Sequence, residues 1–175
     1  LANSLTVGDP LDESTDIGPM ARLDLRDELS QQVTDSIAQG ATLLCGGDAP
    51  EGAGFFYTPT VLSGVRPGMP AFDDETFGPV AALVDADDAT HAIQLANMSK
   101  YGLSASIWTR DTERARGLAR EIEVGGVFIN SMPVSDPRIP IGGVKNSGYG
   151  RELSHFGVHE FVNAKAIWVN QDAPK

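Results

Sequence analysis

Residues 80–130, "VAALVDADDATHAIQLANMSKYGLSASIWTRDTERARGLAREIEVGGVFIN", alternate short apolar runs with helical patterns. The apolar residues 80–84 and the runs "GLSASIWT" and "GGVFIN" are typical of strands. Between these runs, Asp87 or Asp88 can cap one helix and Asp111 can cap another, since an Asp side chain accepts hydrogen bonds from free N–H groups of the first turn. Strand, helix, strand, helix, strand is the pattern of a mostly parallel sheet covered by helices. The stretch therefore predicts an α/β fold.

The segments on either side of this stretch add further elements. Residues 20–39 carry apolar side chains at intervals of four, which predicts a helix that ends at Gly40; these are Leu25, Leu29, Val33 and Ile37. The runs "ATLLCGG" and "FFYTPTVLSGV" predict strands before residue 80. A short helix around residues 151–161 and a final strand over "AKAIWVN", residues 164–170, are expected at the C-terminal end. The alternation in that last strand suits a sheet edge that needs a partner.

Residues 131–150, "SMPVSDPRIPIGGVKNSGYG", interrupt this pattern with closely spaced Pro, Gly and Ser. A long loop inside a compact domain is usually functional or disordered. Repeated Gly and Pro favour a loop with a defined path.

Charge and composition exclude several classes of partner. The 175 residues carry 13 Lys and Arg against 24 Asp and Glu, a net charge of -11, so we expect no nucleic-acid partner and no anionic membrane surface. No apolar run approaches the roughly 18 residues of a membrane span. The single Cys45 precludes an intramolecular disulfide and favours a cytoplasmic setting. The first residues show no secretory signal, and the start without Met suggests a piece of a longer protein.

The residues most often used in catalysis have ordinary structural explanations here. His155 and His159 have the spacing of two metal ligands on one helix turn, but no further ligand lies nearby, so we expect no metal site and two helix-surface histidines. Cys45 stands between apolar residues, which favours a small buried side chain over a nucleophile. The glycines of residues 142–150 match neither the P-loop nor the dinucleotide-binding spacing. We expect no catalytic residue in this chain.

Two other stretches offer binding groups. Residues 73–80, "DDETFGPV", place carboxylates beside an aromatic ring and a Gly-Pro turn, which is either a solvated acidic loop or part of a pocket. Ser135 and Arg138 place a hydroxyl donor and a guanidinium on the long loop, where they are either solvated or suited to a carboxylate.

Several motifs in a fixed order carry a resemblance to a known family. They are "VGDPLDESTDIGPM", "GATLLCGG", "FYTPTVL", "DDETFGPV", "ANMSKYGLSASIWT", "GGVFIN" and "PIGGVKNSGYGRELSHFGVHEF". Together they cover nearly the whole chain, which resembles the C-terminal part of an NAD(P)-dependent aldehyde dehydrogenase. The loop before the last motif is most similar to that of bacterial succinate-semialdehyde dehydrogenases. Betaine-aldehyde, lactaldehyde and other semialdehyde enzymes stay open.

The resemblance implies roles for four residues. Glu75 matches the carboxylate that hydrogen-bonds the nicotinamide-side ribose, and Phe77 matches the ring that packs against that end of the cofactor, NAD or NADP. Ser135 lies in the loop that lines the aldehyde tunnel, where such a Ser binds the distal carboxylate of the substrate, and Arg138 is a helper. The implied chemistry is attack of a Cys thiolate on the aldehyde, hydride transfer from the thiohemiacetal to the nicotinamide, and hydrolysis of the thioester.

The resemblance also implies a domain organisation. Residues 1–157 would be the C-terminal portion of the catalytic domain, with a three-layer α/β arrangement, and residues 158–175 an oligomerisation arm that ends in a strand and joins homodimers or homotetramers. We expect the nucleophilic Cys, the general-base Glu and the dinucleotide-binding domain to lie outside the printed sequence, so that the fragment alone would be inactive. The alternative is a catalytically dead, stand-alone domain that assembles through its edge strand.

Overall fold

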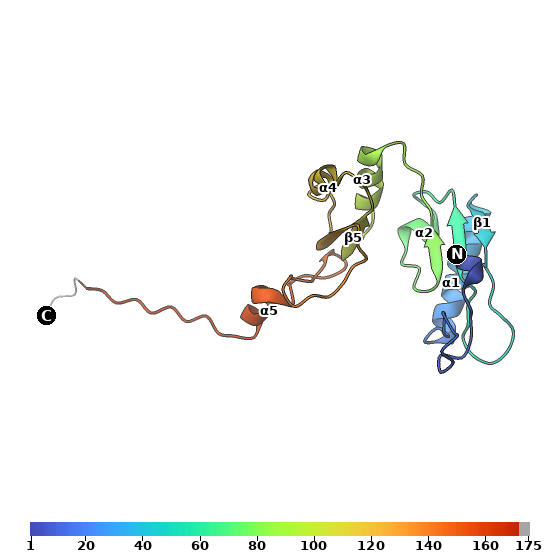
Figure 1. Ribbon diagram of the computed structural model, residues 1–175, viewed down its shortest axis with the longest axis horizontal. Helices are drawn as coiled ribbons and strands as arrows, with labels where there is room; N and C mark the ends of the chain where they lie inside the picture. The colour runs from blue at the N-terminus through green and yellow to red at the C-terminus, as the bar shows by residue number, and fades with distance from the viewer. Residues whose placement is uncertain (172–175) are drawn as a thin grey trace. The chain divides into compact units, whose positions relative to one another are not determined.

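The computed structural model describes residues 1–171 in two compact units, Leu1–Ser99 and the unit that begins at Lys100 (Figure 1). The first unit contains, in order, η1 (Ala2–Ser4), α1 (Leu23–Ala38), β1 (Thr42–Cys45), β2 (Thr60–Ser63), α2 (Pro70–Asp73), β3 (Val80–Ala82) and α3 (Ala89–Asn97). The second contains β4 (Tyr101–Gly102), β5 (Ser104–Ile107), α4 (Thr112–Leu118), β6 (Gly126–Ile129), β7 (Val144–Lys145) and α5 (Ser154–Glu160).

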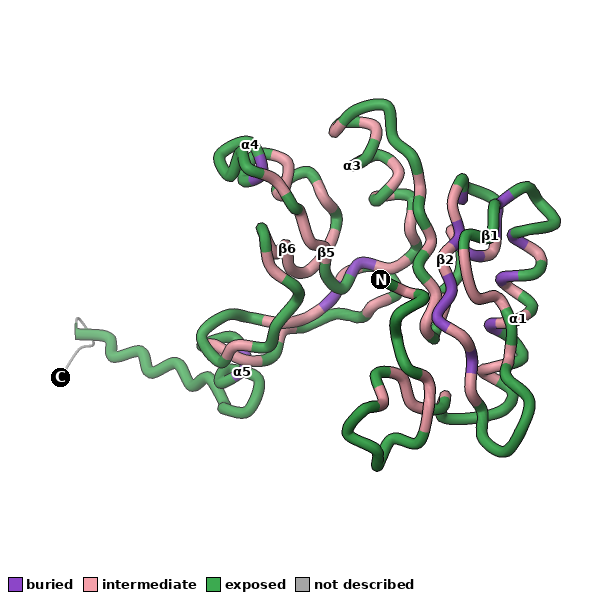
Figure 2. The backbone as a smooth tube through the Cα atoms, turned by 45° about the vertical axis from the view of Figure 1, so that its right-hand side comes forward, coloured by how far each residue is buried: buried purple, intermediate pink, exposed green. Residues whose placement is uncertain are grey.

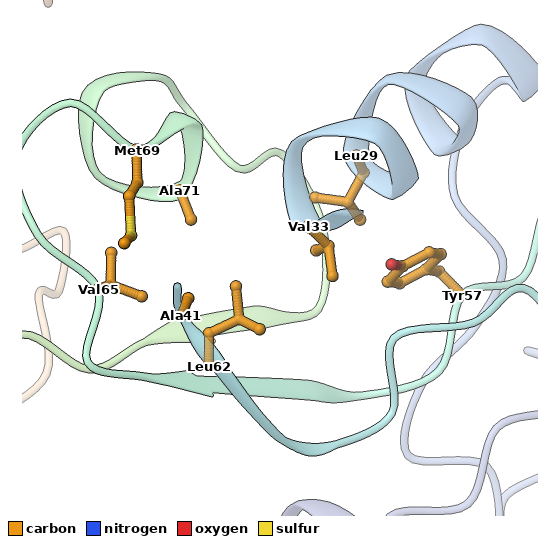
Figure 3. Close-up of a cluster of buried hydrophobic side chains, with 8 residues drawn as sticks. All are labelled: Leu29, Val33, Ala41, Tyr57, Leu62, Val65, Met69 and Ala71. Carbon is orange, nitrogen blue, oxygen red and sulfur yellow. The ribbon is translucent and has the colours of Figure 1, made fainter. Parts of the chain in front are cut away.

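The core of the first unit lies between α1 and the sheet β1-β2-β3. Figure 3 shows Leu29 and Val33 projecting from α1 towards Leu62 of β2 and the ring of Tyr57, and all four side chains are buried. The other buried members of this cluster are Ala41, Val65, Met69 and Ala71. In Figure 2 several of the buried segments lie along α1 and β2. The loop at residues 73–80 is attached to this core through β3.

The helix predicted over residues 20–39 is confirmed as α1, but its apolar stripe is shorter than predicted. Leu29 and Val33 are buried, whereas Leu25 is half-buried and Ile37 is exposed. An α-helix has 3.6 residues per turn, so each step of four residues rotates about 40° beyond a full turn. Residues spaced by four therefore move gradually around the helix, and the ends of the stripe face away from the core. Ser36 replaces Ile37 inside, where its Oγ accepts a hydrogen bond from Ala71 N at 3.0 Å and donates to the Gln32 carbonyl at 2.7 Å.

The predicted helix boundaries are set by local hydrogen bonds. Asp88 caps α3, since its carboxylate accepts from His91 N at 2.8 Å, and Asp111 caps α4 by accepting from Arg114 N at 2.9 Å. After α1, Gly40 has a φ of 107°, which suits a residue without Cβ. The helix expected around residues 151–161 is confirmed as α5.

The α/β content is confirmed, but a single, mostly parallel sheet was the wrong prediction for the described residues. The strands divide among three small sheets: β1-β2-β3, β4-β7 and β5-β6. Only β2-β3 and β5-β6 pair in parallel, while β1-β2 and β4-β7 are antiparallel. Hydrophobic runs locate strands, but their partners depend on contacts distant in sequence.

The strand predicted over residues 164–170 is not formed. These residues have no regular secondary structure, and Ile167, Trp168 and Val169 are 83%, 91% and 74% exposed. A strand needs hydrogen bonds from a neighbouring strand, and within residues 1–171 no segment pairs with this one. The last residues of the predicted arm, 172–175, lie outside the described residues.

Candidate functional site

The loop "DDETFGPV" joins α2 to β3 and is held in a tight path. Gly78 N–H donates to the Thr76 carbonyl at 2.9 Å, and Val80 N–H donates to the Gly78 carbonyl at 2.8 Å. A Cβ on Gly78 would lie 2.5 Å from Cδ2 of the core residue Leu29, so only glycine fits without displacement. The Pro79 carbonyl accepts from Thr60 N at 2.8 Å, which fastens the end of the loop to β2.

Glu75 and Phe77 both present their side chains to solvent from this loop. The Glu75 carboxylate is exposed and has no hydrogen-bond or ionic partner among residues 1–171, while its backbone carbonyl accepts from Gln32 Nε2 at 3.2 Å. The Phe77 ring is 63% exposed and lines an apolar cavity of ≈ 270 Å³. The other residues of that lining are Met20, Ala21, Leu25, Thr76 and Gly78. A fixed backbone therefore presents a free carboxylate two residues from an accessible ring.

In the second unit, Ser135 lines a cavity of ≈ 170 Å³ between the loop and the strands β5 and β6. The strands contribute Ser104, Gly126 and Phe128, and the loop contributes Pro133, Val134, Ser135, Pro140, Ile141 and Gly142; Leu103 and Gly125 complete the lining. The walls are predominantly apolar. The Ser135 hydroxyl has no hydrogen-bond partner among the described residues, so it is available to a ligand.

Arg138 does not belong to the lining of that cavity. Its guanidinium donates to both carboxylate oxygens of Asp136, with the Nη2–Oδ2 distance at 2.5 Å and the Nε–Oδ1 distance at 2.9 Å. These hydrogen bonds hold the pKa of Asp136 below its ordinary value of 3.8 and raise the pKa of Arg138. The two loop residues that the sequence singled out therefore have different environments.

The other chemically notable residues lie outside the linings of these two cavities. His155 and His159 are exposed on α5 with ring centroids 6.0 Å apart. Cys45 is half-buried, with Sγ 3.8 Å from the Pro59 carbonyl oxygen. Within residues 1–171, no three His, Cys, Asp or Glu side chains are grouped as metal ligands, and no helix has the length and apolarity to cross a bilayer.

The sequence did not single out three residues of this unit that lie at the cavity or directly beside the loop at residues 131–150. Asn130, at the end of β6, exchanges two hydrogen bonds of 2.8 Å with the backbone of Thr109. Arg151 Nη1 donates to the carbonyls of Gly143 and Gly150 at 2.9 and 2.6 Å. Ser104 lines the cavity itself. Asn130 has a positive φ of 54°, a conformation that Gly, Asn and Asp tolerate best. An Asn directly after a predicted strand is therefore the sequence signal that could have pointed to it.

Comparison with known proteins identifies the family. The aldehyde dehydrogenase family model matches residues 1–167. A succinate semialdehyde dehydrogenase of Escherichia coli (strain K12), named for NAD(P)+, is 58% identical over 167 residues, which are 95% of this chain and 36% of that protein.

Solved structures give the same result. The chain superposes on an NAD-dependent aldehyde dehydrogenase from Sinorhizobium meliloti with a TM-score of 0.94 and 40% identity, over 99% of this chain and 35% of that one. For a succinic semialdehyde dehydrogenase from Streptococcus pyogenes in complex with NADP+, the TM-score is 0.91 and the identity 37%, over 96% and 37% of the two chains.

The chain therefore belongs to the aldehyde dehydrogenase family. It spans 36% of the length of the curated relatives from Escherichia coli and Mycobacterium ulcerans, so it corresponds to part of such an enzyme.

Proposed function

We propose that this chain is part of an NAD(P)-dependent aldehyde dehydrogenase that oxidises succinate semialdehyde to succinate. The observation that carries the substrate assignment is the free Ser135 hydroxyl in an apolar-walled cavity. Such a cavity suits a short carbon chain, and a hydroxyl donor suits a terminal carboxylate. The name of the Escherichia coli relative at 58% identity supports the same substrate.

The loop at residues 73–80 fits the cofactor. A carboxylate can accept hydrogen bonds from two vicinal ribose hydroxyls, and the Glu75 carboxylate is exposed and unpaired within the described residues. The exposed Phe77 ring offers an apolar face to a neighbouring ring. When bound, the nicotinamide accepts the hydride of the aldehyde carbon. Glu75 would hold the ribose and Phe77 would limit the position of the ring.

For Arg138 we propose an indirect role. Its bidentate contact with Asp136 fixes the turn that follows Ser135. It therefore helps the substrate site through the path of the loop.

The remaining proposals concern assembly and location. We propose that residues 1–157 are the C-terminal portion of the catalytic domain with a three-layer arrangement. Residues 158–175 are then an arm that adds a strand to another subunit in a homodimer or homotetramer. The exposed apolar residues of the arm that the structure describes support this role. We infer a cytoplasmic enzyme from its single cysteine.

The test uses the complete protein that contains this chain. Formation of reduced nicotinamide is followed with NAD and with NADP for succinate semialdehyde, butanal, betaine aldehyde and lactaldehyde. We expect the highest kcat/KM for succinate semialdehyde, and we expect Ser135→Ala to lower it more than the value for butanal. Another preferred aldehyde would overturn the substrate, and oxidation of none would overturn the enzyme assignment.

A second candidate function is assembly without catalysis. The exposed Trp168 and its apolar neighbours suit an inert domain that assembles through its C-terminal segment. That domain would form oligomers without oxidising any aldehyde, so the same assay combined with a mass measurement separates the two proposals.

A further inference from the structure

A second serine faces the cavity that contains Ser135. Ser104 is the first residue of β5, and its register partner on β6 is Gly126. Both residues line the cavity together with Phe128, two residues further along β6. Because Gly126 has no side chain, the Phe128 ring approaches it closely, with Cε2 3.5 Å from the position that a Cβ would take.

The orientation of Ser104 follows from Ser106. Side chains two residues apart in a strand point to the same face of the sheet. Ser106 Oγ donates to the carbonyl of Ser131, the first residue of the loop, at 2.9 Å. The face of β5 that carries Ser104 is therefore the face that this loop covers.

The Ser104 hydroxyl is a hydrogen-bond donor in a cavity with predominantly apolar walls. The Ser104 side chain has no hydrogen-bond partner among residues 1–171, as is also true of Ser135. No Lys, Arg or His is among the described residues of the lining. Two unpaired hydroxyls, one on the strand and one on the loop, are thus the side-chain hydrogen-bond donors of an otherwise apolar cavity.

We propose that Ser104 is a second specificity-determining residue, which binds the carboxylate end of the substrate together with Ser135. This inference rests on the proposed function and extends it, because it adds a hydroxyl on β5 to the Ser135 hydroxyl as a donor to the charged end. A carboxylate has lone pairs for both donors, whereas an alkyl end would leave both hydroxyls unpaired.

The test compares kcat/KM for succinate semialdehyde and butanal in the complete protein. We expect Ser104→Ala to lower kcat/KM for succinate semialdehyde by about ten- to hundredfold, mainly through KM, since a hydrogen bond to a charged group is lost. The value for butanal should stay within about twofold, because the cavity wall itself is kept. Ser104→Thr, which retains a hydroxyl, should restore most of the selectivity.

Ser63→Ala is the matched control, since Ser63 is a half-buried strand serine on β2 that lines neither the Ser135 cavity nor the Phe77 cavity. It should leave both substrates unaffected. An equal loss for both aldehydes in Ser104→Ala, or no loss for either, would overturn the role of Ser104 while aldehyde oxidation stands. If the wild-type protein oxidises no aldehyde, the proposed function fails and this inference fails with it.

Discussion

The Glu75 side chain can be changed with little effect on folding, because it is exposed. Its carboxylate has no partner within the described residues, while its backbone carbonyl is held by Gln32. In the complete protein we expect Glu75→Gln to reduce kcat/KM by about ten- to hundredfold, because a hydrogen bond to a charged group contributes about 1.5–3 kcal/mol. The thermal midpoint should stay unchanged. Steady-state kinetics with varied nucleotide and a melting curve measure both.

Asp73→Asn is the matched control for this variant. Asp73 is also an exposed carboxylate and lies two residues before Glu75. Its neutralisation should leave kcat/KM unchanged. Normal kinetics in Glu75→Gln would remove the proposed contact between this residue and the ribose.

The pKa of Asp136 reports on the contact between this residue and Arg138. Because hydrogen bonds from Arg138 lower the pKa of Asp136 below 3.8, the pair stabilises the folded loop above that pH. The contribution is lost as the pH falls through the lowered pKa. We expect Arg138→Ala to raise the pKa of Asp136 back towards 3.8, as followed by NMR of its carboxyl carbon. Arg116→Ala, which removes an exposed contact with Glu113, should not shift it. An unshifted Asp136 in Arg138→Ala would contradict the bidentate contact.

At the scale of elements, Asn130 connects the ends of β5 and β6. Its Oδ1 accepts from Thr109 N–H and its Nδ2 donates to the Thr109 carbonyl, both at 2.8 Å. We expect Asn130→Gly to remove both bonds while the backbone keeps its positive φ, since glycine adopts that conformation freely. Hydrogen exchange at the Thr109 amide should become about tenfold faster, as the loss of a bond of about 1.4 kcal/mol implies.

Asn146→Gly is the comparison for this variant. Asn146 lies within residues 131–150, and among the described residues its hydrogen bond is a backbone one, from its N–H to the Lys100 carbonyl at 3.0 Å. Exchange at Thr109 should be unchanged in this variant. If Asn130→Gly also leaves the rate unchanged, then the side chain of Asn130 does not connect the two strands.

The elements also show which features a sequence predicts. The caps Asp88 and Asp111 were predictable because a cap depends on residues within one helical turn. The pairing of β3 with β2 was not, because Thr60 and Val80 meet only through the fold. Ser104 was missed for the same reason, since its cavity is formed by Gly126 on another strand and by a distant loop.

In the candidate site, too, the sequence predicts which residues matter but not the contacts that they make. Family motifs single out Glu75, Phe77, Ser135 and Arg138 by position, and their proposed roles stay predictions. Their environments are not readable from the motifs. The Arg138 guanidinium is bound by Asp136, whereas the Ser135 hydroxyl is left unpaired within the described residues, and both outcomes depend on the path of the loop.

For the whole molecule, the distribution of apolar side chains indicates where another subunit would bind. Large buried side chains gather in the unit Leu1–Ser99, while residues near the C-terminal end leave theirs in solvent; those at least half exposed are Val158, Phe161, Val162, Ile167, Trp168 and Val169. Apolar patches that stay exposed in one chain commonly mark an interface. The consecutive apolar residues Ile167, Trp168 and Val169 include two β-branched side chains and suit addition of a strand to a sheet edge, which supports the proposed arm.

Ile167→Pro tests the proposed arm in the complete protein. Proline removes a backbone N–H and fits poorly inside a paired strand, so a strand added to another subunit should lose register there. We expect light scattering after gel filtration to show a smaller assembly than the wild-type homodimer or homotetramer. Ile167→Val keeps both the N–H and the β-branched side chain, and it should assemble normally. A Pro variant with the wild-type mass would show that residues near 167 do not pair as a strand, and the interface would then have to use other surfaces of the chain.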